Sequence, residues 1–90
     1  MTVRKTEVEV FGSVPNAPIM RVSGRKYPGV LIQGDSLHNL LSLVQAIEGC
    51  IDAGDKVSAG ETLNEVKELL QGYLAVYEKT LSEAGMSLPY

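Results

Sequence analysis

The chain has 90 residues, a mass of 9.7 kDa and a formal net charge of −3. This length predicts one domain with a small core, and a composition of 44% hydrophobic and 21% charged residues excludes a disordered chain. No run of about 18 apolar residues is present, which argues against a membrane-spanning helix. No apolar segment typical of a signal peptide follows the first residues, so we expect a cytoplasmic protein.

Cysteine and histidine are too rare for several classes of protein. The single cysteine, Cys50, cannot form an internal disulfide, and acidic neighbours make it a poor reactive thiol. One cysteine and one histidine, His38, also leave few soft ligands for zinc. We therefore expect no metal, no cofactor and no disulfide scaffold.

Charge is distributed unevenly along the chain. Residues 1–30 carry five basic and two acidic side chains, a balance of +3, whereas residues 31–90 carry three basic and nine acidic ones, a balance of −6. This acidic balance argues against a nucleic-acid-binding protein, which usually presents a basic face. It is compatible with a basic protein partner or with plain solubility.

The first half of the chain predicts three short strands, at about residues 6–11, 18–22 and 29–33. Val8 and Val10 alternate with polar residues, as in a half-buried strand. The proline-rich segment 12–18 predicts a turn, with Pro15-Asn16 as the central pair of a type I turn. The apolar run Val30–Gln33 predicts a strand that is buried on both faces in the middle of the sheet.

The second half predicts two helices, at about residues 36–51 and 59–84. Each has an apolar stripe with alternating spacings of three and four. The stripes are Leu37, Leu40, Val44, Ile47 and Ile51 in the first helix, and Leu63, Val66, Leu70, Tyr73 and Tyr77 in the second. Asp35 or Ser36 is expected to cap the first helix, Ser58 and Glu61 to form a capping box on the second, and Gly85 to end it.

These elements predict one α+β domain over residues 1–90. We expect a three-stranded antiparallel β-meander followed by a two-helix hairpin packed on one face of the sheet. The helices are long relative to such a sheet, so apolar surface is expected to remain for a partner. A homodimer is a common way to bury such a face.

A basic loop that precedes the first helix offers a candidate site for a small anionic ligand. Helix N-termini bind anions through free N–H groups, and basic side chains could contribute charge. The candidate residues are Arg21, Arg25, Lys26, Gln33, Asp35, Ser36 and His38. In the alternative interpretation, which we favour, Asp35 caps the helix and occupies the anion position itself. His38 could pair with Asp35, but no arrangement for catalysis is encoded, so we expect no enzyme.

The second helix offers a candidate surface for a protein partner. Glu61, Glu65 and Glu68 form an acidic stripe on one side of it. The stripe indicates either a surface for a basic partner or an ordinary solvated face. Tyr73 and Tyr77 lie on the apolar stripe, where core or dimer contacts are expected.

The segment Arg25–Leu37 reads Arg-Lys-Tyr-Pro-Gly-Val-Leu-Ile-Gln-Gly-Asp-Ser-Leu, with Asn16-Ala17 and Ile19–Val22 ahead of it. It resembles an uncharacterised family of small bacterial proteins, and the resemblance covers about residues 7–45. It implies no particular chemistry. Small acidic proteins of this kind include immunity proteins that neutralise a toxin.

The leading functional hypothesis is a non-enzymatic protein-binding module, with an immunity-type protein that binds a basic partner as the example. One alternative is a small anionic-ligand-binding protein or very small enzyme that uses the basic loop and residues 33–36. Another is a structural homodimer in a larger assembly.

Overall fold

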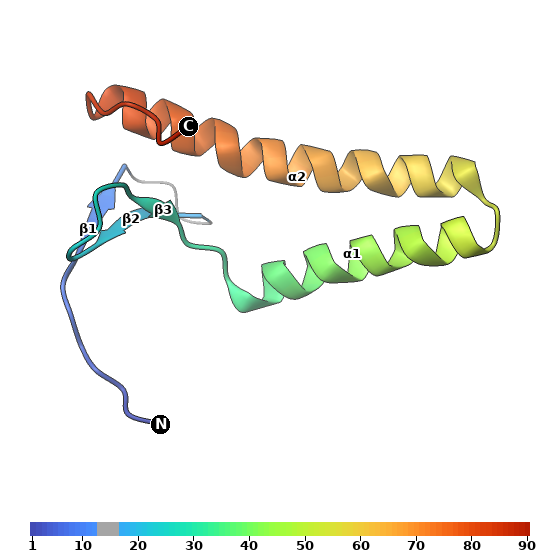
Figure 1. The fold of residues 1–90 in the computed structure, drawn as a ribbon, viewed down its shortest axis with the longest axis horizontal. Coiled ribbons are helices and arrows are strands. Elements are labelled where there is room, and N and C mark those ends of the chain that lie inside the picture. The colour runs from blue at the N-terminus through green and yellow to red at the C-terminus, as the bar shows by residue number, and fades with distance from the viewer. Residues whose placement is uncertain (13–16) are drawn as a thin grey trace.

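Three strands are followed by two helices in the computed structural model, which describes residues 1–12 and 17–90 (Figure 1). The elements are β1 (Val8–Phe11), β2 (Ile19–Val22), β3 (Gly29–Val30), α1 (Gly34–Asp52) and α2 (Lys56–Glu83). The α+β class and the order of elements predicted from the sequence are therefore confirmed. The predicted turn at Pro15-Asn16 lies outside the described residues.

The strands form one antiparallel sheet in the order β1-β2-β3, so β2 is central and β3 is an edge strand. The prediction of a buried central strand at residues 30–33 is wrong. Only Gly29 and Val30 pair with β2, and one further bond joins the Leu31 N–H to the Pro18 carbonyl at 3.0 Å. The chain then leaves the sheet, because residues 31–33 connect the end of β3 at Val30 to the start of α1 at Gly34.

The two faces of the sheet have different environments. Phe11 lies opposite Ile19 in the register, and Ile19 lies opposite Val30, so these three side chains share one face. That face packs against the C-terminal part of α2. The other face carries Val10 and Val22, which are exposed. The pattern of alternation was predicted correctly, but the valine face of β1 is the open one.

The core is small and lies at one end of the molecule. Ile19, Tyr77 and Leu81 form its buried centre, and Leu81 is 0% exposed. Partly buried apolar side chains surround this centre: Phe11, Val30, Val76, Met86 and Leu88. The sheet is thus covered by the last turns of α2, while the rest of the helical hairpin extends beyond it (Figure 1).

The helix starts differ from those predicted. Gln33 is the N-cap of α1 and makes no side-chain capping bond, whereas Asp35 and Ser36 lie inside the helix. The cap of α2 is Asp55, whose Oδ1 accepts a hydrogen bond from the Ser58 N–H at 3.1 Å. Asp55 therefore replaces the predicted capping box, because its side chain already satisfies a free N–H of the first turn.

Both helices end just before a glycine, as predicted for Gly85 after the second helix. At the end of α2, Gly85 has a φ of 71° and its N–H donates to Ser82, while the Met86 N–H donates to the carbonyl of Leu81 at 2.9 Å. This is a Schellman motif, which needs a left-handed residue that glycine supplies without strain. The same arrangement at Gly54 ends α1 and turns the chain into α2.

The connection at residues 53–55 makes α1 and α2 an antiparallel hairpin (Figure 1). Helix α1 packs along α2, yet none of its 19 residues is buried. In the part of the chain that the structure describes, neither helix has the length and apolar character needed to cross a membrane.

Candidate partner-binding surface

Helix α1 carries a row of exposed apolar side chains. Its members are Leu37, Leu41, Val44 and Ile51, which are between 44% and 65% exposed. Spacings of four and three residues keep them on one side of the helix, and Glu48 occupies the same row between Val44 and Ile51. A second set of side chains, including Leu40, Leu43 and Ile47, is half-buried. The stripe predicted as one surface is therefore divided between two sides of α1.

Helix α2 carries a matching row. Leu63, Leu70 and Leu74 are between 45% and 50% exposed, and Lys67 completes the row with spacings of four, three and four. The buried or half-buried side chains of the same stretch, such as Val66 and Leu69, lie on another side of the helix. Each helix thus has one covered row and one exposed apolar row.

The two exposed rows lie on the same side of the hairpin. At about 100° per residue, each exposed row is rotated about 90° from the covered row of its helix, in the same rotational sense. Antiparallel helices that lie side by side direct such rows to the same side of their common plane. The rows Leu37–Ile51 and Leu63–Leu74 therefore form one continuous surface, which we call the apolar face.

The acidic stripe lies on the other side of the hairpin. Glu61, Glu65 and Glu68 are all exposed, and on α2 they are centred about 170° away from the row of Leu63, Leu70 and Leu74. The hairpin thus carries the apolar face on one side and the acidic stripe of α2 on the other. The sequence identified the acidic side but not the separate apolar face.

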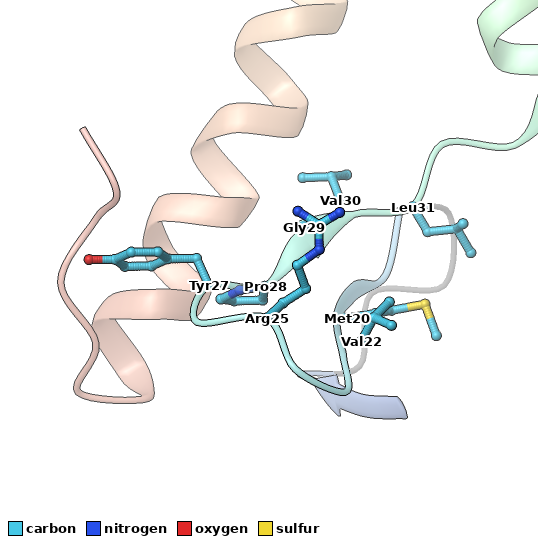
Figure 2. Close-up of a pocket in the computed structure, with 8 residues that line it drawn as sticks. All are labelled: Met20, Val22, Arg25, Tyr27, Pro28, Gly29, Val30 and Leu31. Carbon is cyan, nitrogen blue, oxygen red and sulfur yellow. The ribbon is translucent and has the colours of Figure 1, made fainter. Parts of the chain in front are cut away.

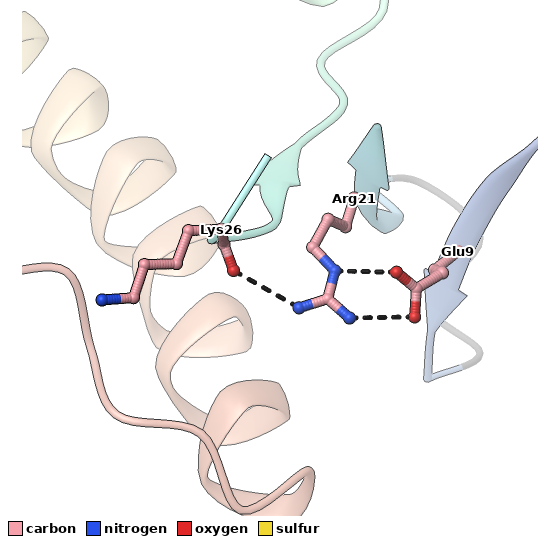
Figure 3. A network of polar contacts seen from close by, with 3 residues as sticks. All are labelled: Glu9, Arg21 and Lys26. Atoms are coloured by element: carbon pink, nitrogen blue, oxygen red, sulfur yellow. Dashed lines mark hydrogen bonds and ion pairs between the residues drawn. The ribbon is translucent and has the colours of Figure 1, made fainter. Parts of the chain in front are cut away.

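The predicted ligand residue Arg21 is engaged within the sheet (Figure 3). Its guanidinium donates two hydrogen bonds to the carboxylate of its cross-strand neighbour Glu9, at 2.8 and 2.9 Å, and one to the Lys26 carbonyl at 3.3 Å. It also lies 5.5 Å from the centroid of the Phe11 ring. Hydrogen bonding from Arg21 lowers the pKa of the Glu9 carboxyl, which keeps this exposed pair charged.

Of the other two basic candidates, Arg25 lines an open depression of about 370 Å³ beside β2 and β3 (Figure 2). Its lining includes Met20, Val22 and Leu31, and Arg25 is its one charged lining residue. Lys26 is exposed, and its ammonium group lies 5.5 Å from the centroid of the neighbouring Tyr27 ring. The depression is therefore mostly apolar, with one cation at its border.

The helix N-terminus does not contribute to this depression. Gln33, Asp35 and His38 are exposed, and Ser36 is half-buried. The Asp35 Oδ1 accepts a hydrogen bond from the Ser36 N–H at 2.9 Å, so this acceptor lies at the anion position. The structure does not bring these four residues together with Arg25 in one site. Among the described residues, no group of three His, Cys, Asp or Glu side chains is arranged to hold a metal ion.

The two candidate tyrosines have different environments. Tyr73 is half-buried. Tyr77 is a core residue, and its hydroxyl donates a hydrogen bond to the Pro28 carbonyl at 2.8 Å. Burial raises the pKa of this hydroxyl, and electrostatic repulsion from the ionised form of nearby Tyr27 adds to the effect. Tyr77 thus holds the segment before β3 against α2.

The chain matches the model of a family of unknown function (DUF6959) over residues 3–90. The chain belongs to this family. The match extends over both helices, beyond the resemblance at residues 7–45 seen in the sequence. Neither a curated protein nor a solved structure matches the chain.

Proposed function

We propose that this protein is a non-enzymatic protein-binding module whose binding surface is the apolar face of the helical hairpin. The observation that carries the proposal is the alignment of the two exposed rows, Leu37–Ile51 and Leu63–Leu74, on one side of the hairpin. Contiguous apolar surface on a folded protein is typical of interaction sites, because leaving it in water costs free energy that a partner recovers.

The contacts of α1 support the same proposal. This helix has 19 residues and buries none of them. Most of the stability of a helix in a protein comes from packing of its apolar side, and among the described residues α1 has only α2 beside it along most of its length. A partner on the apolar face would cover the second row of α1 and stabilise the whole hairpin.

The acidic stripe is the weaker candidate surface. Glu61, Glu65 and Glu68 lie on the side of α2 away from the apolar row, and exposed charges on their own contribute little to affinity. A bacterial immunity-type role in the cytoplasm, with a basic toxin as partner, would use this stripe for attraction. Replacement of Glu61, Glu65 and Glu68 by lysine tests this role.

The experiment is affinity capture from a lysate of the native host with the tagged full-length chain, read by mass spectrometry. The double variant Leu41→Glu/Leu70→Glu places charge on the apolar face. Ala46→Glu is the control for position, because it places one negative charge on the opposite side of α1, at an exposed position. Far-UV circular dichroism verifies that each variant keeps its helices.

We expect a stoichiometric partner, another protein or an untagged copy of the chain, that binds the wild type and the control but not the double variant. A partner lost only when Glu61, Glu65 and Glu68 are all replaced by lysine would move the binding surface to the acidic stripe. Equal capture by wild type and double variant contradicts the proposal.

A further inference from the structure

We propose that the occupant of the apolar face is a second copy of this chain, which packs its own apolar face against the first in a two-fold symmetric dimer. This inference rests on the proposed function and specifies its partner. In such a dimer the two hairpins stack as two layers of two helices each. The sheets lie at the ends of the hairpins, and the acidic stripes face outward. The support comes from surface area, shape and charge.

The accessible surface is much larger than a compact monomer of this mass requires. The chain exposes 6951 Å². A folded monomer of 9.7 kDa exposes about 5,100 Å², so the excess is roughly 1,800 Å². Part of this excess belongs to the exposed N-terminal residues 1–7, and the exposed apolar rows of the hairpin add to it. A stable interface takes about 800 Å² from each partner, which this excess can supply.

The shape is that of a thin plate. The radius of gyration is 16.7 Å, whereas a compact chain of 90 residues has about 12 Å. The molecule measures 48 × 37 × 22 Å, and both helices lie side by side in the view down its shortest axis (Figure 1). The apolar face is therefore one of the two broad faces. Stacking two copies across it doubles the shortest dimension to about 44 Å, close to the other two.

The charges within the apolar face are self-complementary. Each exposed row contains one charged residue, Glu48 on α1 and Lys67 on α2. Neither forms an ion pair within the described part of the chain. In a two-fold interface the same surface occurs on both sides, so an acidic and a basic group are both offered to the other copy. A surface that binds a strongly basic partner would instead be expected to have only acidic residues among its charged side chains.

The test is the mass of the full-length protein in solution, measured by sedimentation velocity from about 1 µM to about 200 µM. We expect the wild type and Ala46→Glu to sediment as a dimer of about 19 kDa, twice the chain mass, and Leu41→Glu/Leu70→Glu as a folded monomer. A wild type that stays monomeric at every concentration overturns the proposal. So does a dimer that persists in the double variant, since its interface would lie elsewhere.

A milder pair of substitutions keeps the test decisive if the charged variant does not fold. Leu41→Ala with Leu70→Ala removes apolar surface without adding charge, at exposed positions where the fold tolerates change. We expect it to raise the dimer dissociation constant about tenfold or more. An unchanged constant overturns the proposal.

The two proposals fail in different ways. A monomeric wild type that still captures another protein through the apolar face overturns the second copy as occupant and leaves the binding function in place. A monomeric wild type that captures nothing through this face overturns both.

Discussion

The Tyr77 hydroxyl donates a hydrogen bond to the Pro28 carbonyl at 2.8 Å and so joins two segments that are 49 residues apart in sequence. Pro28 has no N–H of its own and precedes the edge strand β3, which pairs with β2 through only two residues. The bond therefore fixes the end of the sheet to α2. This contact and the apolar contacts around Ile19 and Leu81 hold the α and β parts of the domain together.

Replacement of Tyr77 by phenylalanine should destabilise the fold by about 1–2 kcal/mol, because the Pro28 carbonyl loses its buried donor. Urea unfolding at one fixed protein concentration measures the change. The matched control is Tyr73→Phe, at a half-buried tyrosine, which should alter stability by less than about 0.5 kcal/mol. Equal effects of the two substitutions would contradict a special role for the Tyr77 hydroxyl.

Stability should also fall at alkaline pH through Tyr77. Burial raises the pKa of its hydroxyl above the ordinary value of 10.0, so the folded protein keeps a proton that the unfolded chain loses. This contribution is complete below about pH 10 and declines as the pH rises above that value. The stability difference between wild type and Tyr77→Phe should therefore shrink between about pH 10 and about pH 12. A constant difference across this range would exclude the effect.

Truncation of the core leucine should be far more costly than truncation at the far end of the same helix. Leu81 is fully buried, so Leu81→Ala should cost about 2–5 kcal/mol through lost contacts and a cavity. Val57 is 73% exposed near the start of α2, and Val57→Ala should change stability by less than about 0.5 kcal/mol. Both values come from urea unfolding. A similar cost at the two positions would place the core elsewhere.

The start of α2 allows a direct choice between two capping schemes. Asp55→Ala should lower the melting temperature, because the Ser58 N–H loses the side-chain acceptor that caps the helix. Asp55→Asn retains an acceptor oxygen and should restore most of the loss. Ser58→Ala keeps the backbone donor and should have little effect. If Ser58→Ala were the most destabilising of the three, the capping box with Glu61 would be the correct description.

Much of the fold follows from local sequence signals. Gly54 and Gly85 end the two helices because only a residue that adopts positive φ readily completes a Schellman motif. Spacings of three and four residues located both helices, and alternation in β1 placed Val8 and Val10 on one face of the sheet. The third strand was overestimated, since an apolar run such as Val30–Ile32 does not reveal where a chain leaves the sheet.

The candidate surface needed the tertiary structure. The sequence marks Leu37 and Leu40 alike as members of one apolar stripe, because periodicity records which side of a helix is apolar and not what covers it. Only the position of α2 beside α1 shows that Leu40 is half-buried and Leu37 exposed. The same holds for Arg21, whose partner Glu9 is set by strand register. The sequence by itself thus determined the elements and their ends, which depend on neighbouring residues. The tertiary structure decided which apolar residues remain exposed, because burial depends on contacts between segments far apart in the chain.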